Sequence, residues 1–221
     1  MTALANQPLS DLPLGEIATA LPGATAVLHR HRLDFCCGGG ATLAEAAAKR
    51  GLDAAAIAAE LAALEPGASE LPQETEALIA LILERFHAGH RRDLPELIRL
   101  ARKVEAVHRE RADAPAGLAD LLEETAAELE SHMQKEESVL FPMMLRGSHP
   151  MIGMPISMMR HEHDDHGANL ERLAALTGDF TPPADACRTW RALYAGLDRL
   201  REELMLHIHT ENNVLFPRFG A

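Results

Sequence analysis

The sequence predicts an all-α protein. Alanine, leucine and glutamate dominate its 221 residues, whereas aromatic residues make up only 4% and β-branched runs are scarce. No stretch alternates apolar and polar residues over the length that a half-buried strand needs. Apolar residues instead recur at helical spacing in segments that are separated by proline and glycine. We therefore expect helices joined by short turns, without a sheet.

The first 65 residues are expected to form a small helical domain. Its predicted helices cover residues 14–21, 24–32, 43–50 and 54–64. Pro22-Gly23 ends the first of them, and Gly51 ends the third. Thr42 and Glu45 have the spacing of a capping box at the start of the third helix. Residues 65–69 have the composition of a linker, so we place this domain at residues 1–65.

From about residue 74 onward, the predicted helices are much longer. They cover about residues 75–111, 118–145, 156–176 and 185–215. Pro95 lies inside the first of these and should bend it. Four long helices with short connections are typical of an antiparallel four-helix bundle. We expect this bundle to form a second domain at residues 74–221.

Charge and cysteine content limit the classes of partner and compartment. The formal net charge is −12, which argues against binding to nucleic acid or to an anionic membrane surface. Only three cysteines occur, Cys36, Cys37 and Cys187, which suits a reducing compartment better than a disulfide framework. No apolar run approaches the roughly 20 residues of a membrane helix. The sequence therefore predicts a soluble, cytoplasmic protein.

The second and fourth long helices contain an internal repeat whose residues can bind a metal ion. Residues 132–142 and 207–217 both read H-x-x-x-E-x-x-V-L-F-P. In each copy, histidine and glutamate are four residues apart, so both side chains lie on one helix face and can reach one metal ion or two adjacent ions. Burying two imidazoles and two carboxylates is costly without partners, and a metal satisfies all four. The pairs His132–Glu136 and His207–Glu211 therefore predict a metal site inside the bundle.

Histidines on the other two long helices lie at a similar level. Counting from the predicted turns places His132 and Glu136 opposite the low nineties of the first helix and opposite His163 on the third. The candidates on these helices are His87, His90, His161, His163 and His166. Helical rotation turns His161 and His209 away from the neighbouring candidates, so both are expected to be solvated. Spacing leaves open which of the others are ligands.

Several motifs resemble those of one known family. They are Asp-Phe-Cys-Cys-Gly-Gly at 34–39, Leu-Pro-Glu-Leu at 94–97, His-Met-Gln-Lys-Glu-Glu at 132–137, Glu-His-Asp at 162–164 and Glu-Asn-Asn-Val-Leu-Phe-Pro at 211–217. With these residues, essentially the whole chain resembles the iron–sulfur cluster repair di-iron proteins of the YtfE/ScdA type. That family joins a hemerythrin-like bundle to a small N-terminal domain with paired cysteines.

The resemblance implies a ligand set and a cofactor. Carried over position by position, the family's iron ligands fall on His87, His132, Glu136, His163, His207 and Glu211. The resemblance thus selects His87 over His90 and His163 over His166, although a further role of His90 or His166 as a ligand stays open. Imidazole and carboxylate donors without thiolate suit iron or manganese better than a structural zinc ion. The implied cofactor is a pair of iron ions with an oxo or hydroxo bridge.

The resemblance also implies a function. It indicates a protein that repairs iron–sulfur clusters damaged by nitrosative or oxidative stress by supplying iron, with damaged iron–sulfur proteins as partners. Reduction of NO to N2O at the same irons is one alternative, which leaves open whether the protein is an enzyme. Binding or sensing of O2 is a further alternative, but the attached cysteine domain argues against it. Whether the chain forms a homodimer is also open.

Cys36 and Cys37 are candidates for a redox or metal-transfer role. They precede the helix that Thr42 caps, and a helix N-terminus lowers the pKa of a thiol. The three glycines that follow would permit close approach of another molecule. The alternative is that one of the two cysteines is a small buried apolar residue.

Overall fold

Helices account for the regular structure of the described chain. The structure is a computed structural model that describes residues 7–64, 71–147 and 150–220. Within these ranges the all-α class is confirmed, because the only β interaction is an isolated bridge between Pro13 and Thr42. The predicted linker at 65–69 lies outside the described residues. Two compact units are distinguished: Ile79–Leu204 forms one, and the described residues up to Leu78, together with those from Met205 onward, form the other.

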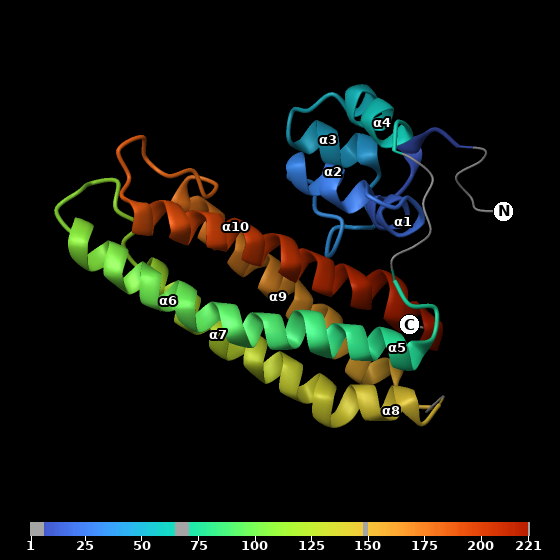
Figure 1. The fold of residues 1–221 in the computed structure, drawn as a ribbon. Coiled ribbons are helices and arrows are strands. Elements are labelled where there is room, and N and C mark those ends of the chain that lie inside the picture. Colours follow the sequence, from blue (N-terminus) through green and yellow to red (C-terminus); the bar gives the residue numbers. More distant parts are fainter. Residues whose placement is uncertain (1–6, 65–70, 148–149, 221) are drawn as a thin grey trace. The chain divides into compact units, whose positions relative to one another are not determined.

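Short helices form the N-terminal part of the chain (Figure 1). They are the 3₁₀ turn Leu9–Asp11 and the α-helices α1 (Leu14–Ala20), α2 (Ala24–Arg30), α3 (Leu43–Lys49) and α4 (Ala54–Ala62). The predicted helices agree with α1 to α4 to within two residues at each end. The capping box is confirmed, since the Glu45 amide donates to Thr42 Oγ1 at 3.2 Å and the Thr42 amide donates to Glu45 Oε2 at 2.9 Å.

Buried aliphatic side chains hold these short helices together. Ile17, Leu28, Leu43 and Leu61 come from α1, α2, α3 and α4 in turn, and each is fully buried. Between α2 and α3, the chain is anchored by Phe35, which is 1% exposed. Burying one such side chain contributes about 1.5–3 kcal/mol. The core therefore fixes both ends of the segment that carries the paired cysteines.

The long helices are built from α-helical and π-helical segments. They are α5 (Thr75–Leu81), η3 (Ile82–His87), α6 (Ala88–His108), α7 (Leu118–Lys135), η4 (Glu136–Leu140), α8 (Phe141–Leu145), α9 (Gly153–Thr177), α10 (Arg188–His209) and η5 (Thr210–Leu215), followed by the 3₁₀ turn η6 (Phe216–Phe219). Within Ile79–Leu204, α6 packs against α7, and α7 against α9 (Figure 1). Pro95 lies inside α6, which stays helical on both sides of it. None of the described helices combines the length and apolar character required to cross a bilayer.

In the part of the chain that the structure describes, three π-helical turns interrupt the predicted helices. His87 is the last residue of η3, Glu136 is the first residue of η4, and Glu211 is the second residue of η5. A π turn has i→i+5 hydrogen bonds and is frequent at functional sites. The hydrophobic periodicity did not predict these turns. Their positions coincide with three of the six predicted ligands.

One tryptophan lies at the end of the bundle that is remote from the repeat, and the helices pack around it. Trp190 on α10 is fully buried, and its ring lies 6.1 Å from that of Tyr194 and 4.9 Å from that of His108. The Arg111 guanidinium covers the indole at 5.4 Å, a cation–π arrangement. Gly196 on α10 packs closely against α6, since a Cβ atom there would lie 2.6 Å from Leu97 Cδ2. This end of the bundle is therefore tightly packed.

Candidate metal centre

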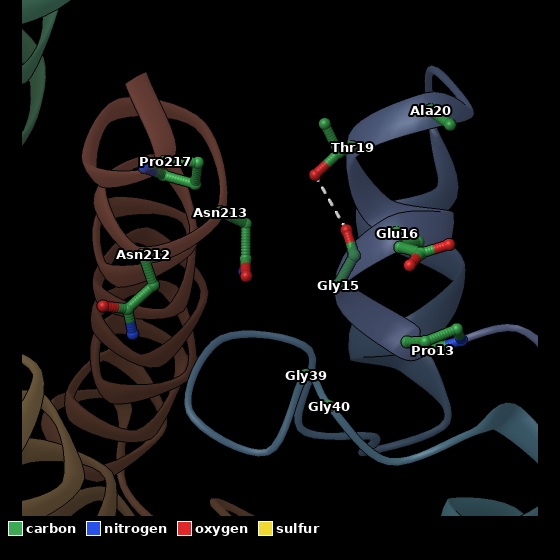
Figure 2. Close-up of a pocket in the computed structure, with 10 residues that line it drawn as sticks. All are labelled: Pro13, Gly15, Glu16, Thr19, Ala20, Gly39, Gly40, Asn212, Asn213 and Pro217. Carbon is green, nitrogen blue, oxygen red and sulfur yellow. Dashed lines mark hydrogen bonds between the residues drawn. The ribbon is translucent and has the colours of Figure 1, made fainter. Parts of the chain in front are cut away.

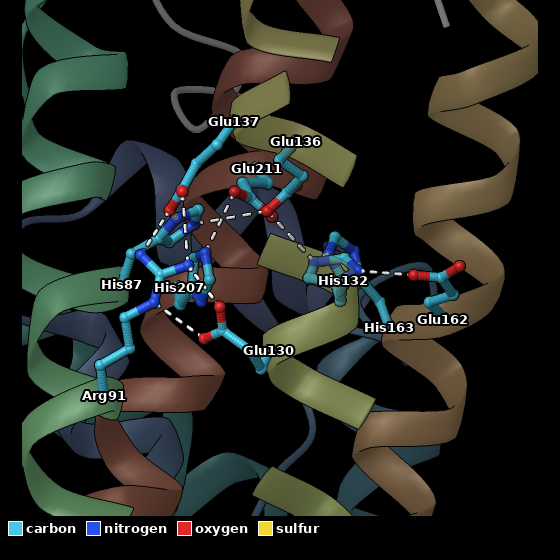
Figure 3. Close-up of polar contacts among 10 residues, drawn as sticks. All are labelled: His87, Arg91, Glu130, His132, Glu136, Glu137, Glu162, His163, His207 and Glu211. Carbon is cyan, nitrogen blue, oxygen red and sulfur yellow. Dashed lines mark hydrogen bonds and ion pairs between the residues drawn. The ribbon is translucent and has the colours of Figure 1, made fainter. Parts of the chain in front are cut away.

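The six predicted ligands lie in two overlapping groups. His87, Glu136, His207 and Glu211 form one group, and His132, Glu136, His163 and Glu211 form the other. In each group the potential ligand atoms all lie within 4.8 Å of one another, and no member is more than 1% exposed (Figure 3). Glu136 and Glu211 belong to both groups. The structure thus brings together all six residues and gives the two carboxylates the shared positions.

The chemistry of these donors fits a bound cation. Oε2 of Glu136 lies 3.3 Å from Nε2 of His87 and 3.4 Å from Nε2 of His132. Nε2 of His163 lies 3.2 Å from Nε2 of His132, so two imidazoles direct the same type of donor atom toward one point. In the second copy of the repeat, His207 Nε2 lies 3.1 Å from a Glu211 oxygen. Imidazole and carboxylate donors without thiolate are appropriate for iron.

Carboxylates hold the outer nitrogens of two of these histidines. Nδ1 of His87 lies 2.7 Å from Glu137 Oε1, and Nδ1 of His132 lies 3.0 Å from Glu162 Oε2. The hydrogen bond from His132 lowers the pKa of Glu162 to about 2, although burial acts in the opposite direction. A carboxylate at Nδ1 fixes the tautomer that leaves Nε2 free to bind a metal. Sequence reasoning missed both carboxylates, although each is adjacent in sequence to a predicted ligand.

The remaining histidines divide between buried and exposed positions. His90 and His166 are buried but belong to neither group of ligand atoms, and the His166 ring meets that of His132 edge-on at 5.0 Å. His161 is exposed, as expected. The expected solvation of His209 is wrong, because its ring packs against Phe35 at 5.5 Å and is 2% exposed. Burial lowers the pKa of His209 to about 4.

The paired cysteines are held in a turn around Asp34. Its carboxylate accepts hydrogen bonds from the amides of Cys36, Cys37 and Gly38 at 3.1, 3.0 and 2.9 Å. The two sulfur atoms are 3.6 Å apart, and Cys36 Sγ lies 3.2 Å from Asp34 Oδ1. Asp34, Cys36 and Cys37 form a third group whose potential ligand atoms lie within 4.8 Å of one another. Sequence reasoning did not assign Asp34 this position.

The expected low thiol pKa is wrong for Cys36. The hydrogen bond with Cys37 and burial of the side chain raise its pKa well above the ordinary value, and the Asp34 charge acts in the same direction. Cys36 precedes the Thr42 cap by six residues, so the dipole of α3 does not reach it. Cys36 is buried and Cys37 is half-buried.

A cavity adjoins the glycine-rich end of this turn. It has a volume of about 480 Å³ and is lined by Pro13, Gly15, Glu16, Thr19, Ala20, Gly39, Gly40, Asn212, Asn213 and Pro217 (Figure 2). The Asn212 side chain donates to the carbonyl oxygen of Cys36, and that of Asn213 to the carbonyl oxygen of Phe35, each at 3.2 Å. The two asparagines that follow Glu211 therefore hold the backbone of the cysteine turn.

Close packing at one glycine leads to a stability prediction. A Cβ atom at Gly39 would lie 2.8 Å from the carbonyl oxygen of Phe35 and 3.3 Å from the Gly15 backbone. Gly39→Ala should therefore lower the free energy of unfolding by about 1–3 kcal/mol, as overpacking does. Denaturant titration of the whole chain measures this change, and hydrogen exchange of the α1 amides locates it.

A neighbouring glycine supplies the control. A Cβ atom at Gly40 would meet nothing within 4 Å. Gly40→Ala should leave stability unchanged or raise it by at most about 1 kcal/mol. Equal destabilisation by both substitutions would contradict the steric account of Gly39.

Family models and related proteins match nearly the whole chain. The model described as the hemerythrin HHE cation binding domain matches residues 78–219, and ScdA_N, described as a domain of unknown function, matches residues 10–65. The "Iron-sulfur cluster repair protein YtfE" of Musicola paradisiaca is 50% identical over 212 residues, which cover 93% of this chain and 94% of that protein. The protein of the same name from Yersinia pseudotuberculosis is 49% identical over 209 residues, covering 93% and 95%.

A third relative has a similar name. The "Probable iron-sulfur cluster repair protein" of Haemophilus influenzae is 46% identical over 211 residues, which cover 93% of this chain and 95% of that protein. The resemblance inferred from the motifs is confirmed by these matches. With a hemerythrin HHE cation binding domain, an ScdA_N domain and about half of its residues identical to those of its relatives, the chain belongs to the YtfE family of iron–sulfur cluster repair proteins.

Proposed function

We propose that this protein repairs iron–sulfur clusters damaged by nitrosative or oxidative stress, in the cytoplasm, by supplying iron from its His/Glu centre. The observation that carries the proposal is the convergence of six buried donors in two groups that share Glu136 and Glu211. The proposal is also supported by the relatives, since about half of this chain's residues are identical to those of proteins named for cluster repair. Bound at this centre, iron supplies the ion that a damaged cluster lacks. Damaged iron–sulfur proteins are then the partners.

The proposed ligand set is His87, His132, Glu136, His163, His207 and Glu211, with two iron ions joined by an oxo or hydroxo bridge. Two imidazoles and the two shared carboxylates would hold each ion, because Glu136 and Glu211 belong to both groups of ligand atoms. We assign the centre to a bundle domain at residues 74–221 and the cysteine turn to a domain at residues 1–65. Iron held by these residues would supply a centre that can bind NO, O2 or an acceptor group.

The role proposed for Cys36 and Cys37 is to pass metal or electrons between the protein and its partner. Their sulfur atoms, of which that of Cys37 belongs to a half-buried residue, form with the exposed Asp34 a small group of donors that would hold an ion briefly. Two thiols alone cannot hold an iron–sulfur cluster. The turn therefore suits transfer rather than storage.

Loss of the thiols should leave the bundle's iron in place. Neither cysteine belongs to the two His/Glu groups, so Cys36→Ser/Cys37→Ser should retain two ions per chain by elemental analysis. The matched control is Cys187→Ser, which replaces an exposed thiol on another part of the chain. Loss of iron in the double variant, but not in the control, would contradict the assignment of two separate sites.

The proposed function is tested by repair of a damaged cluster enzyme. Iron-loaded protein is mixed without oxygen with an NO-treated [4Fe–4S] enzyme, and recovered activity, transferred iron and N2O are measured together. We expect activity to recover in proportion to the iron transferred, and metal-free protein to have no effect. In a parallel mixture with added NO and a chemical reductant, which supply the substrate and the electrons for N2O, N2O formed in excess of the protein without recovery of the enzyme would overturn iron supply and establish NO reduction instead.

A further inference from the structure

We propose that the two metal positions release their ions in a fixed order, in which the ion held by His132 and His163 leaves first and the ion held by His87 stays. This inference rests on the proposed function, because it concerns the same centre and the supply of iron from it. It follows from a difference between the groups that hold His87 and His132 from outside. Those groups all lie within the unit Ile79–Leu204.

His87 is held by a network of forked arginine–carboxylate hydrogen bonds. Its Nδ1 donates to Glu137 Oε1 at 2.7 Å, and Arg91 donates to both oxygens of Glu137 at 2.7 and 3.3 Å. The same guanidinium donates to both oxygens of Glu130 at 2.8 and 3.0 Å (Figure 3). Glu130 also accepts a hydrogen bond from Gln134. Arg91 is therefore fixed between two carboxylates of the neighbouring helical segments. In turn, it fixes the carboxylate that orients His87.

His132 is held by a simpler arrangement. Its Nδ1 lies 3.0 Å from Glu162 Oε2, a longer contact than that of His87. The other oxygen of Glu162 accepts from Lys135 Nζ at 2.6 Å. The Lys135 side chain is about half exposed. The carboxylate that orients His132 is therefore tied by one hydrogen bond to a half-exposed lysine.

The hydrogen-bond networks that hold His87 and His132 differ in rigidity more than in charge. Each places one carboxylate on an imidazole and one cation on that carboxylate. Arginine binds with a planar fork that fixes the orientation of a carboxylate, whereas a lysine ammonium is a point charge on a flexible stem. Arg91 makes four N–H···O contacts, whereas Lys135 makes the one at 2.6 Å among the described residues. The His132 imidazole therefore turns away from its ion more readily than that of His87.

Loss of an outer hydrogen-bond partner typically weakens metal binding about 10–100-fold. A carboxylate that is held less firmly weakens metal binding by part of this amount. The weakening is confined to one metal position, because Glu162 contacts His132 and Glu137 contacts His87. Release of one ion leaves Glu136 beside His87, at 3.3 Å, so the retained ion keeps a shared carboxylate. The centre then supplies one ion per chain while the other holds its ligands in position for reloading.

The test is the rate at which a chelator removes iron. The full-length protein, loaded with two Fe²⁺ per chain without oxygen, is mixed with excess ferrozine, and the coloured complex is followed over time. We expect two phases of equal amplitude whose rates differ by about 10-fold, within the range that loss of an outer partner produces. Glu162→Gln should accelerate only the fast phase, and Glu137→Gln should accelerate only the slow phase.

Two milder variants test the role of the cation. Lys135→Arg supplies a forked partner to Glu162 and should slow the fast phase, and Arg91→Lys should accelerate the slow phase. The control is Arg102→Lys, the same change in another ion-pair network between α6 and α7, where Arg102 contacts Asp120 and Glu123. It should leave both rates unchanged. Circular dichroism of each variant verifies that the helices are intact.

The results separate this inference from the proposed function. If the wild-type protein bound fewer than two ions, the di-iron centre itself would be wrong. If it bound two ions but released them in one phase, or if Glu137→Gln accelerated the fast phase, the order of release would be overturned. In that second case, the repair assay still decides whether iron is supplied.

Discussion

Replacing either shared carboxylate by glutamine should remove most of the iron from the centre. Glu136 and Glu211 belong to both groups of ligand atoms, so each substitution takes an anionic donor from both metal positions. Loss of a direct ligand should weaken binding more than the roughly 10–100-fold that follows loss of an outer partner. We therefore expect Glu136→Gln and Glu211→Gln each to retain less than one ion per chain after desalting, measured by elemental analysis.

The control for this prediction is a carboxylate that lies on the surface. Glu84 is exposed and lies in the same π-helical turn as His87, but it belongs to neither group. Glu84→Gln should retain two ions per chain. If Glu136→Gln or Glu211→Gln also kept two tightly bound ions, the bridging role of that carboxylate would be wrong. Far-UV circular dichroism of the metal-free proteins shows whether each variant is folded.

Truncation of the buried tryptophan should cause the largest loss of stability. Trp190 is fully buried, packs on Tyr194 and His108, and is covered by the Arg111 guanidinium. Trp190→Ala leaves a cavity and removes these contacts, so the free energy of unfolding should fall by about 3–5 kcal/mol. Denaturant titration followed by circular dichroism measures the loss, since the substitution removes the only tryptophan fluorophore.

The same variant separates stability from metal binding. His108, which contacts Trp190, lies 21 residues beyond His87 along the chain, or about 30 Å at 1.5 Å per residue. Trp190→Ala should therefore still bind two ions where the protein is folded. Val107→Ala, at a 66% exposed position on α6, should change stability by less than about 0.5 kcal/mol. A similar loss in both variants would contradict the packing argument.

The repeated His/Glu pairs among the candidate ligands were accessible from the sequence because they depend on local spacing. His132 with Glu136, and His207 with Glu211, lie one helical turn apart, and the repeat places apolar residues after each pair. Helix length and turn position then limit which histidines of the other helices lie at that level. The choice of His87 over His90 needed the family resemblance, since both are buried and only three residues apart.

The residues that hold the candidate ligands by hydrogen bonds could not be predicted from local spacing. Glu162 reaches His132 from another helix, and Arg91 reaches Glu130 and Glu137 from another helix, so these contacts depend on how helices pack. The burial of His209 depends on Phe35, which is remote in sequence. Helical rotation places a side chain on a face, but it does not reveal what covers that face.

The three π-helical turns affect how sequences of this family should be aligned. Each turn extends the hydrogen-bonded ring from i→i+4 to i→i+5, and so accommodates one residue more than an α-helix would. Residues after η3, η4 and η5 are thereby shifted in phase by one position, or roughly 100° of rotation. A hydrophobic pattern scored along an uninterrupted helix assigns the wrong face beyond each turn. Single-residue gaps in alignments with metal-free bundles are therefore expected at residues 82–87, 136–140 and 210–215.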